Sequence, residues 1–119
     1  MKIAISAVAP GIESAVDQRF GRAKYFAVYE TETGEYDFLD NKIQMNAAQG
    51  AGIQTAEMLS KAGVDAVLTG HCGPNAYKAL SAAGIALYIG VSGNLADALK
   101  AYQEGSLSPA DGADVEGHW

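Results

Sequence analysis

The hydrophobic pattern of this 119-residue chain changes its period near residue 50, and this change limits the folds that the chain can adopt. Before it, apolar runs at about residues 2–8, 25–30 and 35–39 have the composition of β-strands. A turn containing Gly34 joins the last two runs into a hairpin, because glycine tolerates the positive φ of tight turns. After it, helical stripes alternate with short strands, so the pattern predicts the order βββαβαβα.

Three helices and two strands are expected in the second half of the chain. The apolar residues of each helix recur at intervals of three and four, and a glycine follows each helix. The expected helices cover about residues 52–61, 74–83 and 95–104, and the expected strands cover residues 65–69 and 85–89.

These elements predict a mixed α/β fold. Crossover connections place the fourth and fifth strands parallel to the first, whereas the hairpin makes the second strand antiparallel. The expected five-stranded sheet has the order 3-2-1-4-5, with strand 2 antiparallel and three helices on its faces. Residues 1–105 then form a single domain, and residues 106–119 form a flexible C-terminal tail because they show no hydrophobic period.

The composition argues against several classes of protein. The formal net charge of −6 does not suit a nucleic-acid partner, and no apolar run approaches the roughly 20 residues that span a membrane. A single cysteine, Cys72, cannot form an intrachain disulfide, which fits a cytoplasmic location. A phosphate-binding P-loop and a serine-hydrolase elbow are both missing, which argues against these two classes of enzyme.

The topology predicts where a binding site would lie. Strands 1, 4 and 5 end at the same edge of the sheet, which we call the carboxyl edge, and open α/β sheets bind ligands there. All three helices begin at this edge, and their N-termini carry partial positive charge. Arg19, Arg22 and Lys24 fall on a loop at the same edge. The sequence therefore predicts an anion site in an otherwise acidic protein.

Residues with metal-binding side chains also fall at this edge. His71 and Cys72 lie in a loop before a helix, where the helix N-terminus favours a thiolate. Imidazole and thiolate are both metal ligands, but one of each cannot complete a zinc site. The alternative is that Cys72 is a small buried thiol, so His71 is the stronger candidate. Met45 and Asn46 precede another helix at this edge, where Met45 could equally fill a gap in the packing.

Several segments resemble the dinitrogenase iron–molybdenum cofactor family. The run Arg-Phe-Gly-Arg-Ala at residues 19–23 is similar to one family segment, and Thr-Gly-His-Cys-Gly-Pro-Asn-Ala at residues 69–76 is similar to another. Residues 51–52, 63–67 and 82–85 match further segments in the same order, and the resemblance covers about residues 1–103. The resemblance implies a ribonuclease-H-like fold, which agrees with the strand order predicted above.

The resemblance implies binding or carriage of an anionic metal–sulfur cluster without catalysis. The chain resembles the small stand-alone members of the family most; these include the orange protein, which binds a mixed molybdenum–copper sulfide cluster without cysteine anchoring. The implied cofactor is a molybdenum-containing metal–sulfur cluster of the molybdenum–copper or iron–molybdenum type, and cluster donor or acceptor proteins are the expected partners. The candidate cluster-binding residues are Arg19, Gly21, Arg22, Asn46, Gly50, Gly52, Gly70, His71, Cys72, Gly73, Ser92 and Gly93, with His71, Cys72 and Met45 as candidate metal ligands.

Two other functions remain open from the sequence. The lone thiol of Cys72 beside His71 could belong to a thiol-based enzyme or a redox sensor. Alternatively, the chain could be a small adaptor that docks on a partner protein through an exposed sheet edge or its tail.

Overall fold

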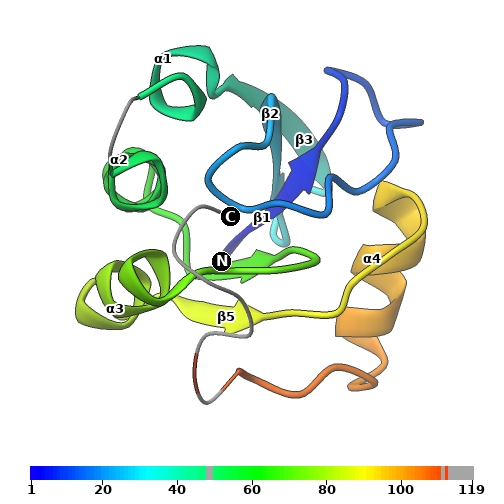
Figure 1. The fold of residues 1–119 in the computed structure, drawn as a ribbon. Coiled ribbons are helices and arrows are strands. Elements are labelled where there is room, and N and C mark those ends of the chain that lie inside the picture. Colours follow the sequence, from blue (N-terminus) through cyan, green and yellow to red (C-terminus); the bar gives the residue numbers. More distant parts are fainter. Residues whose placement is uncertain (48–49, 111, 113–119) are drawn as a thin grey trace.

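A five-stranded mixed sheet forms the centre of the protein (Figure 1). The computed structural model describes residues 1–47, 50–110 and 112. The strands occur in the order β3-β2-β1-β4-β5; β2 is antiparallel to β1 and β3, and β4 is parallel to β1 and β5. This confirms the predicted order and orientation. The strands are β1 (Lys2–Ala7), β2 (Tyr25–Glu30), β3 (Glu35–Asp40), β4 (Ala66–Leu68) and β5 (Ala86–Tyr88).

Three long helices confirm the helical stripes of the sequence. Pro74 occupies the first turn of α3, and Asn94 forms a reciprocal capping box with Asp97 at the start of α4. A short fourth helix, α1, was not predicted, because four residues are too few to show a helical period. The helices are α1 (Lys42–Met45), α2 (Ala51–Lys61), α3 (Pro74–Ala82) and α4 (Leu95–Gln103).

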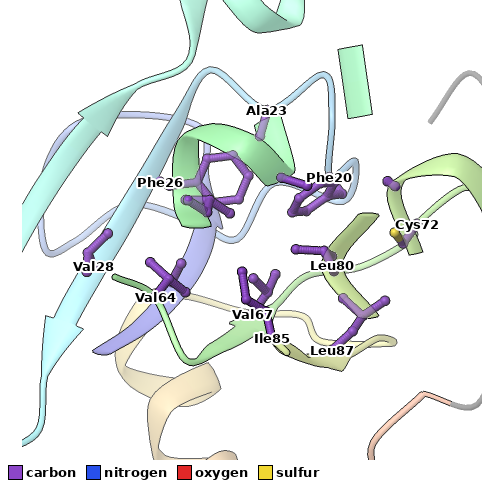
Figure 2. Close-up of a cluster of buried hydrophobic side chains, with 14 residues drawn as sticks. Phe20, Ala23, Phe26, Val28, Val64, Val67, Cys72, Leu80, Ile85 and Leu87 are labelled. Atoms are coloured by element: carbon purple, nitrogen blue, oxygen red, sulfur yellow. The ribbon is translucent and has the colours of Figure 1, made fainter. Parts of the chain in front are cut away.

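Two apolar cores cover the two faces of the sheet. Side chains of β1 alternate between them: Ala4 faces one core, whereas Ile3 and Ile5 face the other. The α2–α3 core lies under α2 and α3 and includes Phe26 and Leu80 (Figure 2). The α4 core lies under α4, on the opposite face of the sheet (Figure 1). Because each helix runs back from the carboxyl edge, the N-termini of α2, α3 and α4 gather there.

The segment after α4 differs from the flexible tail that was expected. Pro109 forms an antiparallel bridge with Tyr88, and the N–H of Ala110 donates to the carbonyl of Leu87 at 2.7 Å. Leu107 packs against the α4 core. Residues 107–110 therefore lie along the outer edge of β5, since they bury apolar side chains and pair with an otherwise terminal strand. Residues 111 and 113–119 of the expected tail lie outside the described residues.

Candidate functional site

Three loops meet at the carboxyl edge and are joined by backbone hydrogen bonds. The segment of residues 14–20 lies between the other two loops. On one side of it, the N–H of Val16 donates to the carbonyl of Gly93 at 2.9 Å. On the other side, the N–H of His71 donates to the carbonyl of Gln18 at 2.8 Å. The predicted gathering of these loops at one edge is therefore present in the structure.

Arg19 and His71 lie directly opposite each other in a parallel bridge. The N–H of Phe20 donates to the carbonyl of His71 at 3.1 Å. In a parallel pair, opposite residues point to the same side, and the next residue on each segment points to the other side. The next residues, Phe20 and Cys72, are fully buried in the α2–α3 core (Figure 2). Arg19 and His71 therefore share the side that faces away from this core.

The thiol of Cys72 lies inside the protein. Its residue is 0% exposed, and its Sγ lies 3.6 Å from the carbonyl oxygen of Gly73. Figure 2 shows Cys72 beside Phe20 and Leu80, among apolar side chains. A cysteine in such surroundings packs as a small apolar residue. The structure thus separates His71 and Cys72, which were both predicted as metal ligands, onto opposite faces of one segment.

A buried polar network holds the segment that carries Arg19. The hydroxyl of Ser6 lies 2.6 Å from the carbonyl oxygen of Asp17 and 2.8 Å from the hydroxyl of Thr69. The Asp17 carboxylate accepts the N–H of Arg19 at 3.0 Å and lies 3.7 Å from its Nε. The side chain of Arg19 is nonetheless 49% exposed, whereas that of Asp17 is 8% exposed. The Asp17 carboxylate therefore orients the guanidinium of Arg19 through Nε, while about half of the side chain remains exposed to solvent.

Arg22 is more engaged with the protein than Arg19. Its Nη1 donates to the carbonyl of Met45 and, at 3.2 Å, to the carbonyl of Ala47. These carbonyls lie at the C-terminal end of α1, where the helix carries partial negative charge. The sequence predicted Arg22 as a charge on an open loop; in the structure it also fastens the end of α1 to that loop.

Met45 and Asn46 line a groove beside Arg22. The groove has a volume of about 290 Å³ and is formed by the start of β2, the end of β3 and α1. Met45 is half-buried, and the side-chain amide of Asn46 donates to the carbonyl of Lys42 at 2.9 Å. The residues that line the groove are Lys24, Tyr25, Asp40, Lys42, Met45 and Asn46.

Three of the predicted cluster-binding glycines lie in close contact with neighbouring segments of the protein. A Cβ on Gly21 would lie 2.8 Å from the backbone of Gly52, and a Cβ on Gly52 would lie 2.8 Å from the Cβ of Ala76. A Cβ on Gly70 would lie 2.7 Å from the backbone of Gln18. These glycines allow segments to approach closely, which is a different role from the predicted backbone contact with a ligand.

The other predicted glycines and Ser92 belong to the turns of the carboxyl edge. Gly50 precedes α2 with a φ of 73°, and Gly93 has a φ of 87° next to Asn94. Gly73 is buried and precedes α3, whereas Ser92 is exposed. The structure thus places these residues at the edge, at the starts of the three helices.

The N-termini of the three helices at this edge differ in capping. The first turn of α4 is capped by the side chain of Asn94, which accepts the N–H of Asp97 at 2.8 Å. The N-cap residues of α2 and α3 are Gly50 and Gly73, which have no side chain that could cap the first turn. The N–H groups of an uncapped first turn can bind an anion.

Asn41 and Thr55 are buried polar residues near this edge that were not predicted as site residues. Both are 0% exposed, and the side-chain amide of Asn41 donates to the carbonyls of Gly21 and Ala23. The hydroxyl of Thr55 donates to Oδ1 of Asn41 at 3.1 Å. The available signal was weak: Asn41 follows a strand and Thr55 falls on the buried side of a helix, but neither pattern shows what the side chain bonds.

Two kinds of feature are missing from the part of the chain that the structure describes. Among residues 1–47, 50–110 and 112, no group of three or more His, Cys, Asp and Glu side chains is arranged to hold a metal ion. Within the same part of the chain, no helix is both long and apolar enough to cross a membrane.

Solved structures of similar proteins share this fold over nearly their whole length. The apo form of the orange protein from Desulfovibrio gigas is 36% identical, with 96% of each chain covered and a TM-score of 0.93. A putative NifB protein from Thermotoga is 33% identical, with 98% of each chain covered and a TM-score of 0.85.

A further relative and a family comparison extend this likeness. An uncharacterized protein of Methanocaldococcus jannaschii is 29% identical over 110 residues, which are 90% of this chain and 89% of the relative. The sequence pattern of the family described as "Dinitrogenase iron-molybdenum cofactor" matches residues 1–105. The chain therefore belongs to the dinitrogenase iron–molybdenum cofactor family.

Proposed function

We propose that this protein binds and carries an anionic metal–sulfur cluster at its carboxyl edge, without catalysing a reaction. The observation that carries the proposal is the bridge between Arg19 and His71. It presents a guanidinium and an imidazole side by side, on the face turned away from the α2–α3 core. Membership of the cofactor family and the likeness to the orange protein support the same function.

The charges at this edge suit an anionic ligand. Arg19 supplies a half-exposed guanidinium that can donate charge-assisted hydrogen bonds to sulfide or oxide. The uncapped first turns of α2 and α3 add backbone N–H groups at the same edge. Arg22 adds a second positive charge beside α1. A cluster with excess sulfide charge would be attracted here although the protein as a whole is acidic.

The position of Cys72 indicates how such a cluster would be held. Because its thiol is buried in the α2–α3 core, the sulfur ligands would arrive with the cluster and not from the protein. His71 is then the side chain that would contact metal, through a neutral ring nitrogen. The same burial argues against a thiol-based enzyme or redox sensor at Cys72.

We further propose that the cluster contains molybdenum, with copper or iron as the second metal, and that the protein works in the cytoplasm. A carrier must receive its cluster from a donor protein and deliver it to an acceptor. The exposed carboxyl edge would then be the surface that both proteins approach, since the cluster has to pass between them.

Reconstitution tests this function directly. The purified protein is mixed with tetrathiomolybdate and a copper salt, and separately with extracted iron–molybdenum cofactor, and is then passed through a desalting column. We expect a coloured complex with a fixed metal-to-protein ratio. Lys61→Ala serves as a control for charge, because it removes one positive charge at the exposed C-terminal end of α2, at the opposite edge of the sheet. This variant should retain the cluster as the wild-type protein does. Absence of retained visible absorption with every probe would contradict the proposal.

A further inference from the structure

We propose that Asn41 is a positioning residue for Arg22, and that it sets the affinity of the carboxyl edge for its anionic cluster. This inference rests on the proposed function. Asn41 directly follows β3 and is completely buried, although its side chain is polar. A buried amide must find partners for its donors and its acceptor, and those partners identify what it holds.

Each partner of the Asn41 side chain lies in the turn that carries Arg22 or on α2. Its Nδ2 donates to the carbonyl of Ala23 at 2.8 Å and to the carbonyl of Gly21 at 3.3 Å. Its Oδ1 accepts the hydroxyl of Thr55 at 3.1 Å. Gly21 and Ala23 flank Arg22 in the chain, so one amide group restrains the carbonyl of the residue on each side of it.

The backbone of Asn41 adds two more connections. Its N–H donates to the carbonyl of Lys24 at 2.9 Å, and its carbonyl accepts the N–H of Met45 at 2.8 Å. The first bond fixes the other end of the Arg22 turn, and the second begins α1. Arg22 then closes the loop by donating to the carbonyl of Met45. Asn41 and Arg22 thus hold the two ends of the same short helix.

The turn is also held from the opposite side by close packing. The backbone of Gly52, at the start of α2, leaves no room for a Cβ on Gly21, and Ala76 of α3 leaves none on Gly52. The Arg22 turn therefore lies between α2 and the buried amide of Asn41. Close packing on the α2 side prevents the turn from moving toward α2. If the contacts of Asn41 are lost, the turn can move away from α2, which would displace the guanidinium of Arg22.

The chemistry of this position requires an amide. Asparagine offers two donors and one acceptor at short reach, and all three are used. Aspartate has nearly the same shape and keeps the acceptor for Thr55, but as a carboxylate it has no donor for the carbonyls of Gly21 and Ala23. Asn41→Asp therefore removes the side-chain contacts to the Arg22 turn, whereas the backbone bond to Lys24 and the contact to α2 remain.

A double-mutant cycle tests whether Asn41 acts through Arg22. Affinity for the tetrathiomolybdate–copper cluster is measured for Asn41→Asp, Arg22→Ala and the double variant. We expect Asn41→Asp to weaken binding about tenfold when Arg22 is present and less than about twofold when it is absent, as coupled neighbours behave. Equal weakening in both backgrounds would overturn the inference. In the Arg19→Ala background, the tenfold effect should persist, because Arg19 is held by a different network.

Two further variants separate positioning from a general loss of stability. Thr55→Val keeps the shape of the side chain and removes only the hydroxyl, so it tests the same network if Asn41→Asp does not fold. We expect Thr55→Val to weaken cluster binding when Arg22 is present and to have no effect on binding when Arg22 is replaced by alanine. Weakening in both cases counts against the inference. Val64→Ala, a buried truncation at the opposite edge of the sheet, should lower the melting temperature and leave affinity unchanged.

A readout without any cluster distinguishes this inference from the proposed function. In ¹⁵N-labelled protein, Arg22 should show slowly exchanging guanidinium protons and separate Nη signals, because it is held by two carbonyls. Asn41→Asp should average these signals to those of an exposed arginine. Unchanged Arg22 signals would refute the positioning role even if clusters bind. If no cluster binds but the signals change as expected, the proposed function fails and the positioning of Arg22 by Asn41 stands.

Discussion

Replacing Arg22 by alanine should lower both the stability of the protein and its retention of a cluster, whereas Arg19→Ala should lower retention with a smaller loss of stability. The two arginines are three residues apart, and each substitution removes one positive charge, so each variant serves as a control for the other. They differ in what their guanidinium groups contact. Arg22 donates to two main-chain carbonyls, whereas Arg19 lies 3.7 Å from a single carboxylate oxygen and is half exposed.

The expected magnitudes follow from these contacts. A hydrogen bond to a charged group contributes about 1.5–3 kcal/mol when its partner stays buried, and less where water can replace it. Because Arg22 is only partly buried, we expect Arg22→Ala to cost about 1–2 kcal/mol in total. An exposed pair such as Arg19 with Asp17 contributes about 0.2–1 kcal/mol. For a domain of this size, Arg22→Ala should lower the melting temperature by about 4–8 °C, and Arg19→Ala by about 1–4 °C.

Thermal unfolding followed by circular dichroism measures the first effect, and retained visible absorption after desalting measures the second. Arg22→Lys separates charge from geometry, because lysine keeps the charge but lacks the planar fork of donors. We expect Arg22→Lys to lose most of the stability that Arg22→Ala loses while retaining more cluster. If Arg22→Ala melts at the same temperature as the wild-type protein, or if Arg19→Ala is the more destabilised variant, the assignment of Arg22 to the end of α1 is refuted.

Three further predictions concern other parts of the molecule. His71→Ala should lose the cluster or shift its visible absorption, whereas Cys72→Ala should retain the cluster. Iodoacetamide should label Cys72 only in denaturant. The reverse pattern would indicate a cluster anchored by the thiol. Gly52→Ala should cost about 1–3 kcal/mol of unfolding free energy through overpacking, and Ala76→Gly in the same chain should restore part of the loss; urea denaturation of both variants that showed no restoration would contradict the packing argument. Burial raises the pKa of Tyr36 and of Tyr102, so the neutral phenols favour the folded state, and stability should fall as pH rises through their ordinary value of about 10; an alkaline absorbance titration that assigns ordinary values to both would contradict this.

Much of the fold was predictable from local patterns. Strand alternation, helical stripes and the turn at Gly34 depend on neighbouring residues, and the structure confirms the resulting strand order β3-β2-β1-β4-β5. The capping box between Asn94 and Asp97 is equally local, because both side chains lie within one helical turn. Where a local signal was missing, the prediction failed: α1 has only four residues, and residues 107–110 are ordered by contact with β5, which no period in their own sequence reveals.

The place of the candidate site was predictable, but its internal arrangement was not. Since parallel strands end at one edge, the sequence was sufficient to bring Arg19, Arg22 and His71 to that edge. Which of them faces a ligand depends on register between segments far apart in the chain. His71 and Cys72 are adjacent in the chain, and side chains alternate along an extended segment. The register of this segment therefore turns His71 away from the α2–α3 core and places Cys72 inside it.

The elements, their order and the edge at which they converge follow from hydrophobic period and chain direction, so the amino-acid sequence was enough to predict them. The role of each residue at that edge became visible in the tertiary structure. It showed that Gly21 and Gly52 are packed against neighbouring segments, that Arg22 holds the end of α1, and that Asn41 bonds the turn between them. The physical reason is that a buried polar group or a missing Cβ acquires its role from the atoms it meets, and those atoms come from other parts of the chain.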